Sequence, residues 1–186
     1  MLLTGLLGSV LSPGGVRGGL SVLIFHRVLQ RPDPLFPDEP DARRFAEILG
    51  WVGRAFNVLP LDRAIGALTS GQVPPRALAI TFDDGYADNY TVALPVLQRF
   101  GMHATFFVAS GFLDGGRMWN DTVIESIRAC KASSIDLGML GRHDISAPAA
   151  RRRAIDSLLP QIKYLEPSVR LDCAQRVAER CEAVPP

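Results

Sequence analysis

Short apolar runs alternate with amphipathic stretches along the chain. Residues 20–25, 77–82 and 104–109 are rich in branched and aromatic side chains and predict three strands. The first run is almost entirely apolar, so we expect a buried strand that ends at His26. A short extended piece follows at residues 57–60.

Helical spacing fills the segments between the strands. Asp41 can cap a helix whose apolar positions recur three or four residues apart: Phe45, Ile48, Leu49, Val52 and Phe56. Further helices are predicted at residues 61–68, 87–100 and 119–130, and two more after Asp144, separated near Pro167. This strand–helix–strand order predicts an α/β protein with a parallel sheet covered by helices.

The first residues, 1–19, form a separate apolar segment that begins without positive charge. A secretory signal needs a basic start, and a spanning helix needs roughly 18 apolar residues. We therefore expect Met1 to Leu11 to pack as a short helix on the domain or on a membrane surface. The expected location is cytoplasmic or membrane-peripheral rather than secreted.

Composition narrows the function classes. The chain has 186 residues, 47% of them hydrophobic and 21% charged, with a formal net charge of +1, which is typical of a folded domain without a nucleic-acid partner. The basic run Arg151-Arg152-Arg153 is interpreted as a solvated helix face. The cysteines at positions 130, 173 and 181 are odd in number and contain no C-x-x-C pair, so neither a disulfide framework nor a thiolate zinc site is expected.

Candidate chemistry lies where two strands end. Asp83 and Asp84 follow a strand whose carboxyl end is the usual place for sites in α/β folds. Neighbouring side chains on an extended segment point in different directions, so one aspartate would bind a cation while the other faces the substrate. The alternative is a turn, because Asp-Asp-Gly favours turns and an aspartate can cap the following helix.

His26 would join this pair if the strands are parallel, because their carboxyl ends then meet at one rim. A histidine beside carboxylates is a common acid–base arrangement. The alternative is a histidine hydrogen-bonded to a backbone carbonyl.

With these residues the sequence resembles the polysaccharide deacetylases that carry a NodB homology domain, carbohydrate esterase family 4. Thr81-Phe82-Asp83-Asp84-Gly85-Tyr86 matches the first motif of that family. Phe25-His26-Arg27-Val28, residues 104–108 and Trp119-Asn120-Asp121 resemble segments of the branch that deacetylates exopolysaccharides. Residues 20–186 would then form a partial domain of this family.

The resemblance implies a distorted (β/α) barrel and hydrolysis of N-acetyl groups on a polysaccharide or other glycan. It implies a divalent metal, with zinc as the expected ion. Asp83 matches the catalytic base and Asp84 the metal-binding aspartate of the family. The histidine that matches His26 serves as the general acid in this branch.

The second family motif, His-Ser/Thr-x-x-His, does not occur in this chain. His103 and His143 are interpreted as solvated surface histidines. Catalytic zinc normally has three protein ligands, and a closed barrel needs about 200 to 250 residues. We therefore expect an incomplete barrel that corresponds to the N-terminal portion of a deacetylase.

Two other functions are alternatives to deacetylation. The first is a catalytically incomplete fragment that only binds a glycan or a partner chain. The second is phosphoryl chemistry on the paired aspartates, which normally needs a lysine. Lys131 and Lys163 are the only lysines, and this hypothesis is therefore the weaker one. No partner other than the glycan is predicted.

Overall fold

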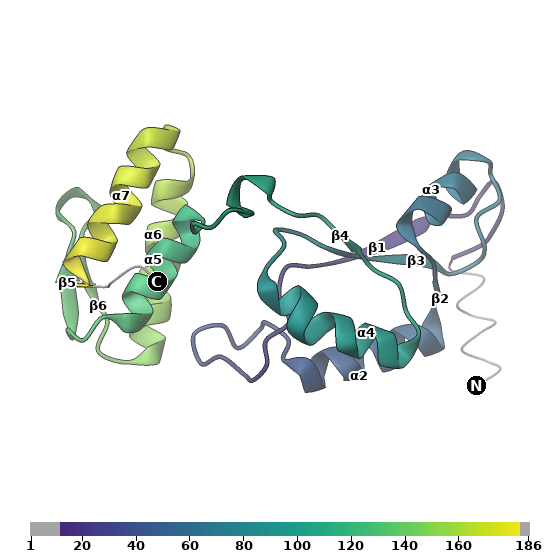
Figure 1. Cartoon of the computed structure of the whole chain (residues 1–186), viewed down its shortest axis with the longest axis horizontal. Helices are drawn as coiled ribbons and strands as arrows, with labels where there is room; N and C mark the ends of the chain where they lie inside the picture. Colours follow the sequence, from purple (N-terminus) through teal and green to yellow (C-terminus); the bar gives the residue numbers. More distant parts are fainter. Residues whose placement is uncertain (1–11, 183–186) are drawn as a thin grey trace. The chain divides into compact units, whose positions relative to one another are not determined.

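The structure is a computed structural model that describes residues 12–182. The chain divides into two compact units (Figure 1): unit 1 comprises Met1–Asp33 and Pro37–Ser110, and unit 2 comprises Pro34–Phe36 and Gly111–Pro186. The short helix expected between Met1 and Leu11 lies outside the described residues.

Unit 1 contains a parallel sheet built on the central strand β3 (Ala77–Phe82). Strand β1 (Leu20–Phe25) pairs with β3 along its full length. On the other edge, β2 (Asn57–Val58) pairs with the first two residues of β3, and β4 (Thr105–Phe106) pairs with the last two. The predicted strands at 20–25 and 77–82 and the extended piece at residue 57 are thus confirmed.

Strand β4 is shorter than the predicted run of residues 104–109. Two further backbone hydrogen bonds continue past it, from Phe107 N to Phe82 O and from Ala109 N to Asp84 O. The segment that follows β3 changes direction at Asp84, where φ is 72°. Regular pairing therefore stops at the end of β3.

Helices α2 (Ala42–Ala55) and α4 (Leu94–Phe100) lie along one face of this sheet (Figure 1). Asp41 caps α2 as predicted, with its Oδ1 accepting a hydrogen bond from the Arg44 amide at 2.7 Å. The apolar positions of α2 that the spacing selected are buried at Phe45, Leu49 and Val52. Helix α3 (Leu61–Thr69) follows β2, also as predicted.

Phenylalanine rings hold the ends of strands β1, β3 and β4 together. Phe82 stacks between Phe25, at 5.3 Å between ring centroids, and Phe106, at 4.9 Å. Phe45 of α2 meets Phe25 edge-on at 5.1 Å. Because aromatic pairs bury large surfaces with defined geometry, this cluster fixes the strand ends from which the candidate site residues continue.

The expectation of a fully buried first strand is wrong. Val22 and Ile24 of β1 are 45% and 56% exposed, whereas Leu23 and Phe25 pack against the core under α2. Within the described residues β1 has a neighbour on one edge only, and α2 and α4 cover the face of the sheet that carries Leu23 and Phe25. The parallel α/β architecture is confirmed; the sheet of residues 12–182 is open, and the barrel stays an expectation.

Unit 2 packs three helices on a small hairpin (Figure 1): α5 (Trp119–Ala129), α6 (Pro148–Lys163), α7 (Pro167–Arg180), β5 (Ser134–Asp136) and β6 (Arg142–Asp144). The helices confirm the predictions, including the break near Pro167. The antiparallel hairpin was not predicted, because three-residue strands are too short to show a period of two. Among the described residues, no helix combines the length and apolar character required to cross a bilayer.

Arg151 and Arg152 were predicted to lie on a solvated helix face, but both contact other residues of unit 2. Arg151 donates hydrogen bonds to the carbonyls of Ile127, Arg128, Cys130 and Ile145. Arg152 bonds Asp156 and the Leu35 carbonyl and lies over the Phe36 ring. Only Arg153 is exposed.

The three cysteines are free and buried. Burial, together with the neighbouring Cys130 thiol, raises the pKa of Cys181 to about 12. A thiol with such a pKa is protonated at neutral pH, so Cys181 is a packing residue rather than a nucleophile.

Candidate active site

His26 and Asp83 occupy matching positions at the ends of neighbouring parallel strands. The register pairs Phe25 with Phe82, and the Asp83 amide donates to the Phe25 carbonyl at 2.9 Å. The residues that follow, His26 and Asp83, therefore leave the sheet side by side. The structure brings the predicted histidine and aspartate to one rim, as the parallel topology requires.

The turn after Asp83 has an unusual backbone. Asp84 and Gly85 both have positive φ, 72° and 75°, and the Gly85 amide bonds back to the Asp83 carbonyl at 2.9 Å. A Cβ on residue 85 would lie 2.8 Å from Val108 Cγ1, so glycine is required there by both conformation and space. Asp84 has a Cβ and adopts positive φ in this turn, so its backbone conformation is energetically unfavourable.

The carboxylates of Asp83 and Asp84 are half-buried and make no hydrogen bond or ion pair with other residues in the range 12–182. The alternative in which one of them caps the following helix is therefore not supported. His26 is exposed and likewise makes no side-chain hydrogen bond within this range. Polar groups that protein atoms do not satisfy are available to a ligand.

An ion pair that the sequence did not predict holds this corner together. Arg27, the neighbour of His26, donates from Nε to Asp88 Oδ2 at 2.8 Å, and its Nη2 lies 2.8 Å from the same oxygen. The other oxygen of Asp88 accepts a hydrogen bond from the Val28 amide at 3.4 Å. Arg27 also lies over the Tyr86 ring, 4.6 Å from its centroid. These contacts connect the residues that follow β1 to the segment just after the aspartate turn.

The helix after the turn is irregular. The prediction of a helix at residues 87–100 holds, but its first part is a π-helix, η1 (Asn89–Ala93), before α4 begins. Asn89 is 5% exposed, and neither its amide nitrogen nor its amide oxygen has a hydrogen-bond partner in the described part of the chain. Single π-turns often mark functional sites.

A small hollow of about 250 Å³ lies beside this π-turn. Its walls include Tyr86, Tyr90 and Val108, and they also include Gly85 of the aspartate turn and Asn89 itself. This hollow could not be predicted from the sequence, because its walls come from the η1 segment and from residues 106–108, which meet only in the fold.

The other two histidines belong to different units, His103 to unit 1 and His143 to unit 2. His103 is exposed, as predicted. His143, expected to be solvated, is half-buried, and its Nε2 lies 2.8 Å from the Leu140 carbonyl in unit 2. Among residues 12–182, no three His, Cys, Asp or Glu side chains gather where a metal ion could be held. These residues thus do not complete the three-ligand set of a catalytic zinc centre.

Part of this sequence is similar to known proteins. Residues 70–138 match the family model of the polysaccharide deacetylases. The YxkH protein of Bacillus subtilis (strain 168), which is named as a polysaccharide deacetylase, is 33% identical over 91 residues, covering 48% of this chain and 31% of that protein. The chain thus spans about a third of the length of this relative.

Solved structures give weaker likenesses. IcaB from Ammonifex degensii is 25% identical with a TM-score of 0.43, covering 60% of this chain and 48% of that chain. A de-N-acetylase from Aggregatibacter actinomycetemcomitans is 19% identical with a TM-score of 0.44, covering 85% of this chain and 84% of that chain. The resemblance predicted from the Thr-Phe-Asp-Asp-Gly motif is confirmed by sequence: residues 70–138, which contain the aspartate turn, match the polysaccharide deacetylase family model.

Proposed function

We propose that this chain provides the acid–base corner of an enzyme that removes N-acetyl groups from a polysaccharide. In this proposal Asp83 is the general base, His26 the general acid and Asp84 a metal ligand. The observation that carries it is the β1–β3 register, which sets His26 and Asp83 at neighbouring strand ends beside the deacetylase motif.

Each role follows from what amide hydrolysis requires. Water is a weak nucleophile at neutral pH, and the Asp83 carboxylate takes a proton from it as its oxygen bonds to the acetyl carbon. The sugar amine is a poor leaving group until it is protonated. A protonated His26 gives it a proton as the carbon–nitrogen bond breaks, which yields acetate and the free amine.

The proposal assigns Asp84 to a divalent metal. Zinc would make the acetyl carbonyl more electrophilic, and Asp84 offers one unpartnered carboxylate for it. The described residues do not supply the remaining ligands. Zinc titration of the chain by calorimetry tests this point, and heat no greater than the buffer background would contradict metal-dependent catalysis by these 186 residues.

Acetate release from N-acetylglucosamine oligomers tests the base assignment. Asp83→Asn keeps the size of the side chain but cannot accept the proton, so the rate is expected to fall by at least about a hundredfold. Asp62→Asn, on the exposed side of α3, is the matched control and should leave the rate unchanged. Full activity of Asp83→Asn would overturn the assignment. A wild-type chain that binds the oligomer without releasing acetate would instead support the non-catalytic fragment.

A further inference from the structure

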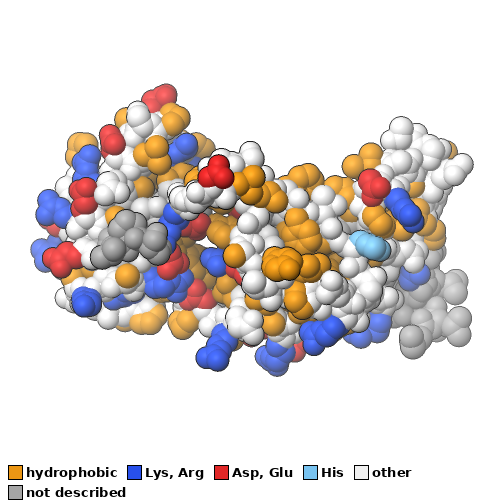
Figure 2. All heavy atoms as spheres, viewed as in Figure 1, with side chains coloured by type: hydrophobic (Ala, Val, Ile, Leu, Met, Phe, Trp, Pro, Cys, Tyr) orange, Lys and Arg blue, Asp and Glu red, His pale blue; other side chains and the backbone are white. Residues whose placement is uncertain are grey.

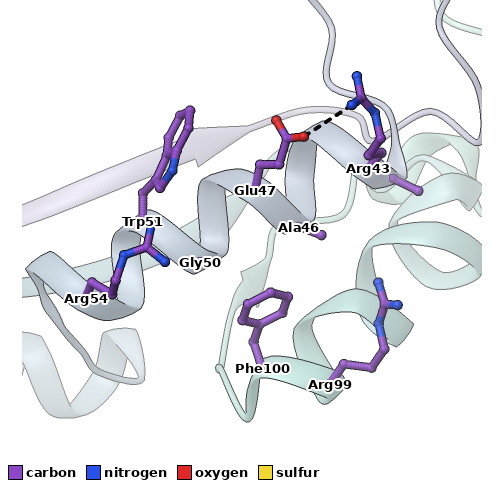
Figure 3. Close-up of a pocket in the computed structure, with 9 residues that line it drawn as sticks. Arg43, Ala46, Glu47, Gly50, Trp51, Arg54, Arg99 and Phe100 are labelled. Carbon is purple, nitrogen blue, oxygen red and sulfur yellow. Dashed lines mark ion pairs between the residues drawn. The ribbon is translucent and has the colours of Figure 1, made fainter.

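A hollow of about 780 Å³ lies between α2 and the end of α4, within unit 1 (Figure 3). Its floor is formed by small residues one helical turn apart, Ala42, Ala46 and Gly50. None of the proposed catalytic residues lines it. It is therefore a surface that the proposed acid–base chemistry leaves unexplained.

The walls of this hollow are positively charged. Arg43, Arg54 and Arg99 line it, with Glu47 as the single acid. Glu47 is already paired, with Arg43 at 3.4 Å and with Arg44 at 3.2 Å. Arg54 and Arg99 form no ion pair or hydrogen bond with other residues in the range 12–182. Figure 2 shows Lys and Arg side chains along the lower edge of unit 1, where α2 runs in Figure 1.

Two exposed aromatic rings accompany these cations: in Figure 3, Phe100 faces α2 from the end of α4, whereas Trp51 extends from the other side of α2. Trp51 is 52% exposed and Phe100 is 40% exposed. A Cβ on Gly50 would lie 3.8 Å both from Arg54 Nη1 and from Phe100 Cε1, so these two side chains approach the floor closely. Arg44 lies over Trp51, 4.8 Å from the ring centroid. Trp51 and Phe100 thus add exposed apolar surface beside guanidinium groups, those of Arg54 and Arg99, that have no protein partner in the range 12–182.

The spacing of the cations suits an extended anionic chain. Arg43 and Arg54 lie eleven residues apart on one helix, which corresponds to about 16 Å at 1.5 Å per residue. Guanidinium groups bind carboxylates through paired hydrogen bonds. Exposed aromatic rings provide flat apolar surfaces for the faces of sugar rings. A floor without large side chains allows a polymer to lie close to the helix.

We infer that the hollow between α2 and α4 binds a stretch of anionic polysaccharide. The preference for a polysaccharide over an acidic peptide rests on the proposed function, since an enzyme that deacetylates a polymer gains from a second contact with it. Arg54 and Arg99 hold the acidic groups, and Trp51 and Phe100 contact the sugar rings. This surface adds affinity for the polymer and takes no part in bond breaking.

Calorimetric titration of the full chain tests this inference without any need for turnover. The probes are oligogalacturonate, which is an anionic sugar polymer, dextran, which is neutral, and polyglutamate, which is an acidic peptide. Oligogalacturonate should bind, with an affinity that falls as salt is raised because the arginines are exposed. Arg54→Gln and Arg99→Gln should each weaken binding about three- to fivefold, the range expected of exposed charge pairs.

Arg63→Gln is the matched control, since Arg63 is an exposed arginine of α3 outside the hollow. It should leave the affinity unchanged, and thermal melting should show that all three variants remain folded. Trp51→Ala should weaken oligogalacturonate more than polyglutamate if the ring contacts sugars. If polyglutamate binds as tightly as oligogalacturonate and Trp51→Ala weakens both equally, the inference is overturned in favour of an acidic peptide. If oligogalacturonate does not bind, or if Arg63→Gln weakens its binding, the inference is overturned altogether. Acetate release, measured separately, reports on the proposed function alone.

Discussion

At the scale of single residues, Asp84 combines conformational cost with a candidate role. Its φ of 72° lies in the left-handed region that side chains other than glycine rarely adopt. Strained backbone of this kind persists where the surrounding structure imposes it, and it clusters at functional sites. The half-buried carboxylate, which has no partner among residues 12–182, is a second feature that costs stability at this turn.

Asp84→Gly should therefore stabilise the fold. Glycine adopts positive φ without penalty, and the change also removes a half-buried charge next to Asp83. We expect the free energy of unfolding to rise by about 1 kcal/mol after the entropy cost of a new glycine is subtracted. Urea denaturation measures it.

Asp84→Ala is the control for this prediction, because it removes the same charge but keeps a Cβ at the strained position. Its gain should be smaller than that of Asp84→Gly. If Asp84→Gly unfolds at lower urea than the natural chain, the backbone at this turn is not strained.

At the scale of elements, Arg151 closes the end of a helix. It lies on α6 and donates to the carbonyls of Ile127, Arg128 and Cys130, at and just beyond the last turn of α5. The last carbonyls of a helix have no partner within it and must be satisfied from outside. One guanidinium with several donors does so here and joins two helices and the hairpin.

Arg151→Ala should lower the stability of unit 2 by about 2 to 3 kcal/mol, since charged hydrogen bonds to partly buried carbonyls are lost together. The neighbouring Arg153 is exposed, so Arg153→Ala should change the free energy of unfolding by less than about 0.5 kcal/mol. Chemical denaturation of both variants measures the difference. Equal effects would mean that the whole arginine run is a solvated face, as the sequence suggested.

The elements also show what a sequence can predict. Strands β1 and β3 and the helices of both units were predicted because apolar spacing records which face of an element is buried. The same spacing could not show that Val22 and Ile24 are exposed, since an apolar residue has no sequence mark that tells whether its face is covered. The hairpin of β5 and β6 was too short to show a period.

The candidate site divides in the same way. Asp83, Asp84 and His26 were found because they end strands and match a family motif. Asp88 was missed because its partner Arg27 lies 61 residues away in sequence, and only the fold brings the two together. The unpartnered amide of Asn89 was missed because a π-turn has no sequence signature in this chain.

At the scale of the whole molecule, the described residues contain two clusters of buried side chains, one in each compact unit. One cluster joins α2, β3 and α4, and the other joins α5, α6, α7 and the hairpin. Helical periodicity reports that a face is buried but not against which element, so the division was not visible in the sequence. Because the two cores are separate, we expect a destabilising substitution in one unit to leave the stability of the other unit unchanged.

Ile155→Ala tests that separation. Ile155 is fully buried in the core of unit 2, and its truncation should cost about 2 to 5 kcal/mol. Hydrogen exchange should then show lost protection of backbone amides in α5, α6 and α7 while β3 keeps its own. Ile80→Ala, in the core of unit 1, should do the reverse. Loss of protection in both units from either change would show that the two cores unfold together, because a cooperative unit loses protection as a whole.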